Sequence, residues 1–434
     1  MDLIKTPFWW EEGAALPPPC ARAPERVELA VVGGGFTGLS AALTGAEKGA
    51  QVAVFDAGQP GQGASTRNGG MIGAPHRPEL AQELETYGAD LAGRLVHEGI
   101  KGYAHTRALH EAAGAYQHTG RVMLAYTRAQ HESLRRQADL LNGFAPQGIE
   151  WLNADEMQAH IRTERYFGGL HFPDHGAVQP RKAHDALLAR AQAAGVEICA
   201  ECGVTGLTPE GDGFRLETEK GSTWARRVVW ATNGYTGTVN RFLARRIFRI
   251  PSFIVATEEL PAGVIDRLAP GRRMMVETRA RHSYFRPSPD GKRILFGGRA
   301  AMVPISHEAA ARRLQATMAE IWPEAAEWRL THSWQGYVGF TFAMTPHVGV
   351  HEGVHFAYGY CGNGVALSPW LGRKAALRAL GDPDGATAFA ETRLESRPYH
   401  IGGVPWFMAI ASPWWRFVVD RRDSAAAARD RARS

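Results

Sequence analysis

The feature that most constrains the fold is a glycine pattern that joins two apolar segments near the N-terminus. Residues 27–32 (VELAVV) predict a buried strand, and they run directly into a G-x-G-x-x-G pattern at residues 33–38 (GGGFTG). A helix of small residues over 39–48 follows, and then a second strand over 51–55 that ends at Asp56. Strand, glycine turn, helix, strand and acid in this order predict a Rossmann-type unit that binds a dinucleotide.

Each position of the pattern has a mechanical role. Gly33 permits the tight turn, Gly35 lets the backbone approach a pyrophosphate, and Gly38 allows the helix to pack closely on the strand. Free N–H groups at the helix start, at Phe36 and Thr37, offer partial positive charge to that pyrophosphate. Asp56, with Ala57 beside it, is placed to accept hydrogen bonds from an adenosine ribose. The unit alone does not distinguish NAD from FAD.

A second glycine-rich loop, residues 61–71 (GQGASTRNGGM), favours FAD. It is too small and polar for a core strand, and it suits a backbone that lies against a flat or phosphorylated ligand. Arg67 is expected to act there as an anion clamp. The candidate cofactor contacts of this loop are Gly63, Ala64, Ser65, Arg67, Asn68, Gly69, Gly70 and Met71.

With this loop the chain resembles the D-amino-acid oxidase superfamily of FAD-dependent oxidoreductases, and within it the γ-glutamylputrescine oxidase group. The resemblance runs nearly end to end. Its other motifs are an aromatic lead at 8–11 (FWWE), a strand and turn at 228–234 (VVWATNG), SYFR at 283–286, and GYCGNGV at 359–365. Four separated motifs in the same order are much more specific than any one alone.

The resemblance implies an α/β fold (α+β overall): a Rossmann-type FAD-binding domain and a second, mainly antiparallel β-sheet substrate domain. We expect the FAD-binding domain at residues 1–75, 179–240 and 334–385. The substrate-binding domain is expected at 76–178 and 241–333, with a C-terminal arm and basic tail at 386–434. Residues 78–136 are helical in pattern, and strand-like segments dominate 242–330.

In the family, the positions of Val204, Ala231 and Gly234 lie over the adenine and pyrophosphate. Gly362, Asn363, Gly364 and Val365 lead into a helix over 366–380, whose first N–H groups would stabilise negative charge on the reduced ring. Relatives with covalent flavin use a Cys within 336–341 or a His near Arg67. Neither is present, so we expect noncovalent FAD.

The candidate substrate residues are Tyr284 and Arg286, which share one face of a strand, with His282 and Arg281 adding positive charge. In relatives that take amino acids, Tyr and Arg grip the carboxylate; a solvated strand face is the alternative. Trp334, Tyr337 and Phe340 suit an aromatic amine pocket or an ordinary core.

Two departures from the family bear on the chemistry. The stretch 336–341 lacks the Arg that holds a simple amino acid in the usual way. Phe296 matches the position where sarcosine-type oxidases carry a Lys that helps oxygen to react, so oxidase and dehydrogenase both stay open. Oxygen or another electron acceptor is the expected partner.

The expected function is FAD-dependent oxidation of a small amine to an imine, by hydride transfer to flavin N5; water then hydrolyses the imine to aldehyde and amine. One alternative is oxidation of an N-methyl or secondary amino acid or another anionic amine, including an aminophosphonate. A second is a flavin-binding subunit of a larger complex. A nicotinamide dehydrogenase is disfavoured by the loop at 61–71.

Composition limits the remaining classes. The net charge of +5 lies largely in the tail 421–434, which we expect to be frayed and solvated rather than a nucleic-acid arm. The chain has no secretory signal pattern and no apolar run of the roughly 18 residues needed for a transmembrane segment, so a cytoplasmic setting fits. The four cysteines predict no disulfide framework, and Cys199 and Cys202 are expected as ordinary strand residues.

A tryptophan-rich segment lies near the C-terminus, at 405–415. We expect its aromatic side chains to pack an arm onto the body of the protein. A membrane-surface segment is the alternative, since Trp favours interfaces.

Overall fold

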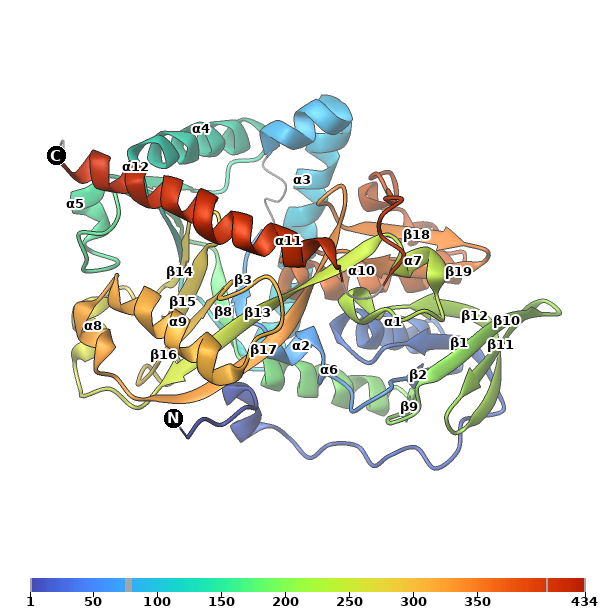
Figure 1. Cartoon of the computed structure of the whole chain (residues 1–434). Helices are drawn as coiled ribbons and strands as arrows, with labels where there is room; N and C mark the ends of the chain where they lie inside the picture. Colours follow the sequence, from blue (N-terminus) through green and yellow to red (C-terminus); the bar gives the residue numbers. More distant parts are fainter. Residues whose placement is uncertain (1, 75–79, 403–404, 433–434) are drawn as a thin grey trace.

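The computed structural model describes residues 2–74, 80–402 and 405–432. Two eight-stranded sheets lie side by side, each covered by helices (Figure 1). The first contains β1 (Arg26–Val32), β2 (Val52–Phe55), β9 (Glu197–Cys199), β10 (Val204–Glu210), β11 (Gly213–Thr218), β12 (Gly221–Trp230), β18 (His347–His351) and β19 (Val354–Tyr358). Strands β9, β2, β1, β12 and β19 run parallel in that order.

The central strand β1 is buried on both faces, as expected for a parallel sheet. Leu29 and Val31 pack in one core cluster with α1 (Phe36–Glu47), α6 (Pro180–Ala193) and α10 (Gly364–Ala379). Ala30 and Val32 belong to the cluster on the opposite face. The predicted strand–turn–helix–strand unit is present, and α1 begins at Phe36, directly after the glycine turn.

The second sheet is mainly antiparallel, as predicted. Its order is β17-β13-β16-β15-β14-β5-β7-β6, and only the β14–β5 pair is parallel. The strands are β5 (Arg121–Leu124), β6 (Glu150–Leu152), β7 (Gly169–Phe172), β13 (Ile247–Thr257), β14 (Met274–Glu277), β15 (Ser283–Pro287), β16 (Ile294–Gly298) and β17 (Leu330–Thr341). Strand β17 pairs with β13 over its whole length, so the expected domain boundary at 334 falls inside a strand of this sheet.

The remaining elements connect and cover the sheets. A small sheet joins β3 (Met71–Ile72), β8 (Gly176–Val178) and β4 (Tyr116–Gln117). The other helices before residue 400 are α2 (Ala64–Arg67), α3 (Leu80–Ala112), α4 (Arg128–Phe144), α5 (Ala154–Met157), α7 (Arg241–Ala244), α8 (Val264–Leu268) and α9 (His307–Ala319). The segment expected to be helical over 78–136 is thus α3, which is broken by non-helical backbone at Gly88, and α4, with β4 and β5 between them. Its first two residues lie outside the described residues.

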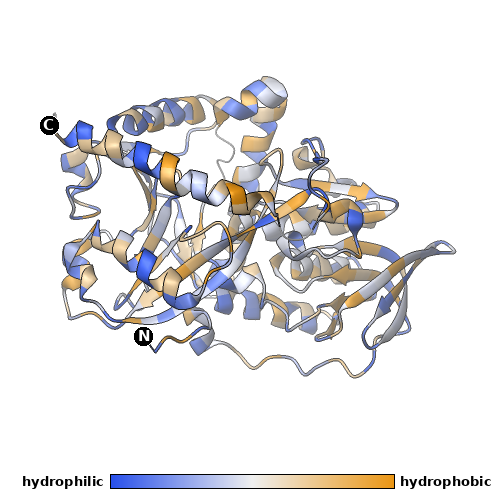
Figure 2. Cartoon of the chain, in the orientation of Figure 1, coloured by the Kyte–Doolittle hydropathy of each residue, from blue (hydrophilic) through white to orange (hydrophobic). Residues whose placement is uncertain are grey.

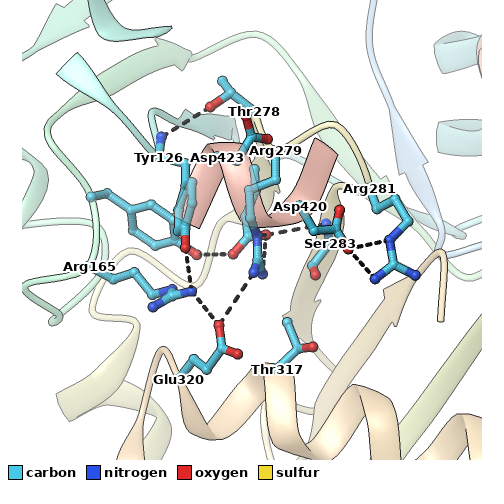
Figure 3. A network of polar contacts seen from close by, with 12 residues as sticks. Tyr126, Arg165, Thr278, Arg279, Arg281, Ser283, Thr317, Glu320, Asp420 and Asp423 are labelled. Carbon is cyan, nitrogen blue, oxygen red and sulfur yellow. Dashed lines mark hydrogen bonds and ion pairs between the residues drawn. The ribbon is translucent and has the colours of Figure 1, made fainter. Parts of the chain in front are cut away.

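The C-terminal tail differs from the expected frayed end. Helix α11 (Phe407–Trp414), a π-helical turn (Trp415–Val419) and α12 (Asp420–Ala432) form one rod across the outside of the second sheet (Figure 1). Asp420 forms an ion pair with Arg281 (Figure 3), and the Asp423 carboxylate accepts from the Ala280 N–H at 3.2 Å. These contacts explain the order, because they connect the tail to residues about 140 positions earlier.

Two sequence expectations concern membrane-spanning segments and disulfide bonds. No described helix combines the length and apolar character needed to cross a membrane. The four cysteines are free thiols, and the sequence predicted no disulfide framework.

Candidate active site

A cavity of about 580 Å³ opens at the carboxyl ends of β1, β2 and β12. This is the edge at which parallel α/β sheets bind ligands. It gathers fifteen of the predicted cofactor residues: Gly33, Gly35, Phe36, Thr37, Asp56, Ala57, Gly63, Ala64, Ser65, Asn68, Val204, Ala231, Gly362, Gly364 and Val365.

Three glycines of the first glycine-rich turn occupy positions where a side chain would be strained or would clash. Gly33 has a φ of 104°, a conformation that L side chains rarely adopt. A Cβ on Gly38 would lie 1.7 Å from the Gly33 carbonyl oxygen, so only glycine lets α1 approach the turn so closely. A Cβ on Gly35 would lie 2.8 Å from the Ser65 hydroxyl, which accepts a hydrogen bond from the Phe36 N–H. The two glycine-rich loops therefore meet at the N-terminus of α1.

Asp56 lies at the end of β2, as predicted. Its carboxylate accepts from the Gly34 N–H at 2.7 Å and from the Gly58 N–H at 2.9 Å. Burial raises the pKa of this carboxyl, while the two N–H donors oppose that rise. A carboxylate has about four acceptor positions, so Asp56 can still accept ribose hydroxyls from the cavity that it lines.

A second cavity, of about 220 Å³, adjoins the first and shares residues such as Tyr337 and Gly362 with it. It lies between the second glycine-rich loop and the second sheet. The predicted residues that line it are Ala64, Arg67, Asn68, Gly69, Met71, His282, Tyr284, Tyr337, Phe340, Gly362, Asn363 and Val365. It also contains Arg121, Ser252 and Arg299, which sequence reasoning missed.

The start of α10 lies where the two cavities meet. Asn363 precedes the helix, and its side chain accepts no hydrogen bond from the helix N–H groups. The amide nitrogen of Asn363 is buried, and no described residue accepts a hydrogen bond from it. A polar planar ligand such as a flavin ring would supply that acceptor, and the free N–H groups suit the negative charge of its reduced form. The donor set at this junction therefore fits FAD.

Tyr284 projects from β15 into the second cavity. Its ring lies against Gly69, where a Cβ would come within 2.8 Å, and its hydroxyl is 2.9 Å from the Ser252 hydroxyl. Burial raises the pKa of Tyr284 to about 12, so the phenol is neutral at physiological pH. Tyr284 can donate or accept a hydrogen bond there, but it is not an anionic base.

Arg286 shares a strand with Tyr284 but does not line either cavity. It is 3% exposed, and its guanidinium donates to the carbonyls of Gly70, Val178 and Pro287 and to the side-chain oxygen of Gln117. The structure thus uses Arg286 to join β15 to the loop at Gly70. This differs from the expected substrate clamp, because protein oxygens already occupy the guanidinium donors and Arg286 lies outside both cavities.

Three further predicted residues support the site from outside the cavities. Trp334 is fully buried, and its indole N–H donates to the Arg67 carbonyl at 3.0 Å, so it belongs to the core alternative. Gly70 has a φ of 66° and packs against the Val178 carbonyl and Arg286. Gly234 allows the close approach of Gly339, whose Cα would lie 3.2 Å from a Cβ at Gly234.

Arg67 lines the second cavity, but its guanidinium is engaged in the protein. It donates to the Gln62 carbonyl at 2.6 Å and to the Gln335 carbonyl at 3.2 Å, and it lies over the Trp10 ring. The aromatic lead explains why the loop keeps its shape: the Trp9 and Trp10 indoles donate to the Asn68 carbonyl and the Thr66 hydroxyl. Arg67 therefore braces the loop in this structure.

Phe296 does not lie against either cavity. It is fully buried, and its ring stacks on Phe285 at 5.3 Å in the core of the second sheet. The neighbouring residue on β16 that faces Tyr284 is Gly297, where a Cβ would be 2.3 Å from the ring. The residue of β16 that faces the cavity-lining Tyr284 is thus a glycine and not a lysine.

Similarity to known proteins agrees with this geometry. Residues 28–378 match the family of FAD-dependent oxidoreductases known as DAO, so the chain belongs to that family and is an FAD-dependent enzyme. A probable oxidoreductase, OrdL, from Rhizobium meliloti is 30% identical over 82% of this chain and 83% of its own length. The γ-glutamylputrescine oxidoreductase of Escherichia coli is 27% identical over 84% of this chain and 86% of its own.

A solved structure supports the fold. Glycine oxidase from Geobacillus kaustophilus superposes with a TM-score of 0.71, at 23% identity, over 86% of this chain and 100% of the oxidase. The predicted family and fold class are thus confirmed, and the chain is an FAD-dependent oxidoreductase.

Proposed function

We propose that this enzyme oxidises the CH–NH bond of an amine that also carries an anionic group, such as a carboxylate or phosphonate. The observation that supports this is the charge of the second cavity. Its described lining includes Arg67, Arg121, Arg299 and His282, and no Asp or Glu. A cavity for a free diamine would need carboxylates to offset the substrate's positive charges, whereas this one favours a negative group.

The proposal restricts the expected substrate from any small amine to amines that also carry an anionic group. An N-methyl or secondary amino acid fits, and so does an amine joined to a glutamyl group, which has its own carboxylate. At about 4 Å and an effective dielectric constant near 20, a guanidinium attracts an anion by about 4 kcal/mol.

Several residues of this chain would hold and orient the substrate. Arg121 and Arg299 would bind the anionic group, and the neutral Tyr284 hydroxyl would hydrogen-bond to the substrate near the reacting carbon. Tyr337 and Phe340 would cover its apolar part and exclude water. Bound FAD, held without a covalent bond along the first cavity, supplies the hydride acceptor for the oxidation. The imine product then hydrolyses in water, and oxygen or another acceptor takes the electrons.

The test is anaerobic bleaching of the purified protein's flavin by matched substrate pairs. Each pair contains an amine with a carboxylate and the same amine with that carboxylate replaced by an amide. We expect about a 100-fold higher efficiency for the carboxylate, which corresponds to the loss of about 3 kcal/mol of charged hydrogen bonding. Equal efficiencies, or preference for an unmodified diamine, would contradict the proposal and return the function to a neutral or cationic amine.

A further inference from the structure

The outer face of the C-terminal rod combines an apolar half and a basic half. Six of the eleven exposed large hydrophobic side chains among the described residues lie within 399–417. Trp406, Ile410 and Trp414 recur every fourth residue along α11, so they share one helix face, and they are 55%, 70% and 60% exposed. Phe417, 52% exposed, continues this face.

Three side chains of the rod face the body. Phe407, Met408 and Trp415 are partly buried and pack in the cluster with Phe248 and Phe340. Within the segment 405–415, the packing alternative from the sequence therefore holds for Phe407 and Trp415 and fails for Trp406 and Trp414, which are more than half exposed. Phe417, just beyond that segment, is also more than half exposed, so packing of the rod does not explain these three exposed rings.

Charges on α12 are separated between the two faces. Asp420 pairs with Arg281, and Asp423 and Asp430 accept backbone N–H groups of Ala280 and Arg128. All three acids thus point toward the protein, as Figure 3 shows for Asp420 and Asp423. Arg421, Arg422 and Arg429 are exposed, and the Arg421 guanidinium lies 5.7 Å from the centre of the Phe417 ring. Figure 2 shows hydrophilic residues alternating with apolar ones along α12.

We propose that this face, defined by Trp406, Ile410, Trp414, Phe417, Arg421, Arg422 and Arg429, docks the enzyme on an anionic membrane surface. Indole rings are stable at the boundary between headgroups and acyl chains, and arginines beside them bind lipid phosphates. An anionic membrane would repel acidic side chains on the outer face, whereas binding of a protein partner would not require every acidic side chain of α12 to lie away from that face. Because Phe340 lines the substrate cavity and packs under α11, the docked face is the outer side of the cavity wall.

The test is sedimentation of the full-length, flavin-loaded protein with vesicles of phosphatidylcholine, alone or mixed with the anionic phosphatidylglycerol. We expect binding to the mixed vesicles and little to phosphatidylcholine alone. Trp414→Ala should weaken binding about tenfold through lost apolar burial. The double variant Arg421→Ser, Arg422→Ser should weaken it about fivefold for each arginine at low salt. Retained flavin absorbance shows that the variants are folded.

Trp151→Ala is the matched control, because Trp151 is 38% exposed on β6, on a different element. It should bind vesicles like the wild type. The proposal is overturned if no vesicle binds, or if Trp414→Ala binds as well as the wild type. It is also overturned if the wild type is a dimer that Trp414→Ala converts to a monomer, since the face would then be occupied by a second copy.

Discussion

Arg286 provides the sharpest test of how the two halves of this enzyme are connected, through the variant Arg286→Met. The guanidinium makes four hydrogen bonds of 3.0–3.1 Å to oxygen atoms of the protein. Hydrogen bonds to a charged group contribute about 1.5–3 kcal/mol each, so the gross loss is about 6–12 kcal/mol.

The cost of burying the charge offsets part of that loss. No carboxylate forms an ion pair with Arg286 among the described residues, and burial lowers its pKa to about 9. Relative to its usual value, that shift corresponds to about 5 kcal/mol of desolvation that methionine would not incur. The net destabilisation is then about 1–7 kcal/mol, which for a chain of 434 residues lowers the Tm by about 1–8 °C.

The assay pairs the Tm, followed by flavin fluorescence, with anaerobic bleaching by a carboxylate substrate and its amide. Arg286→Met should lower the Tm and leave the ratio of the two efficiencies within about twofold of the wild type. Arg121→Met is the contrasting variant. Because Arg121 lines the cavity, the ratio of the carboxylate efficiency to the amide efficiency should fall about tenfold or more in this variant, while the Tm changes little. A selective loss of the carboxylate substrate in Arg286→Met, at an unchanged Tm, would refute the structural role.

Three further predictions concern the cofactor and the fold. Acid precipitation should release the yellow flavin into the supernatant as FAD; flavin retained in the pellet would indicate a covalent bond. Asp56→Ala should weaken FAD binding by about 1–3 kcal/mol in a titration of the apoprotein, whereas the surface variant Asp212→Ala should not. His110 is 2% exposed, and burial lowers its pKa to about 4, below its unfolded value near 6.5. The unfolded state therefore binds the proton first, and His110 should lower stability by up to about 3 kcal/mol as the pH drops from 6.5 to 4. In urea unfolding, His110→Gln should remove this part of the slope and leave the part from other buried histidines such as His347, whose pKa burial also lowers.

The cofactor half of the site could be predicted from sequence because its constraints are local. Gly33 needs a φ that other residues rarely adopt, and Gly38 leaves no room for a side chain against a carbonyl five residues earlier. Such requirements are set by the nearest turns of chain, so a short pattern records them. Asp56 follows equally directly, since the end of β2 fixes its place beside the turn.

The substrate half could not be predicted in the same way. Strand alternation correctly predicted that Tyr284 and Arg286 share a face, but not what covers each of them. Tyr284 faces the cavity, while Arg286 lies under carbonyls of Gly70 and Val178, which are more than 100 residues away along the chain. Arg299 reaches the cavity from the residue after β16, where no local pattern marks it.

The C-terminal tail shows that composition alone also fails to predict the structure of a charged segment. Its composition is basic, and basic tails in general are solvated, so composition predicted a frayed end. However, Asp420, Asp423 and Asp430 are spaced for one face of a helix, and the run of alanines between them favours helix. That face becomes visible only when Arg281 and the N–H groups of Ala280 and Arg128 are placed beneath it. Once the acids are bound inward, the arginines face outward, and a tail of modest net charge presents a strongly basic surface.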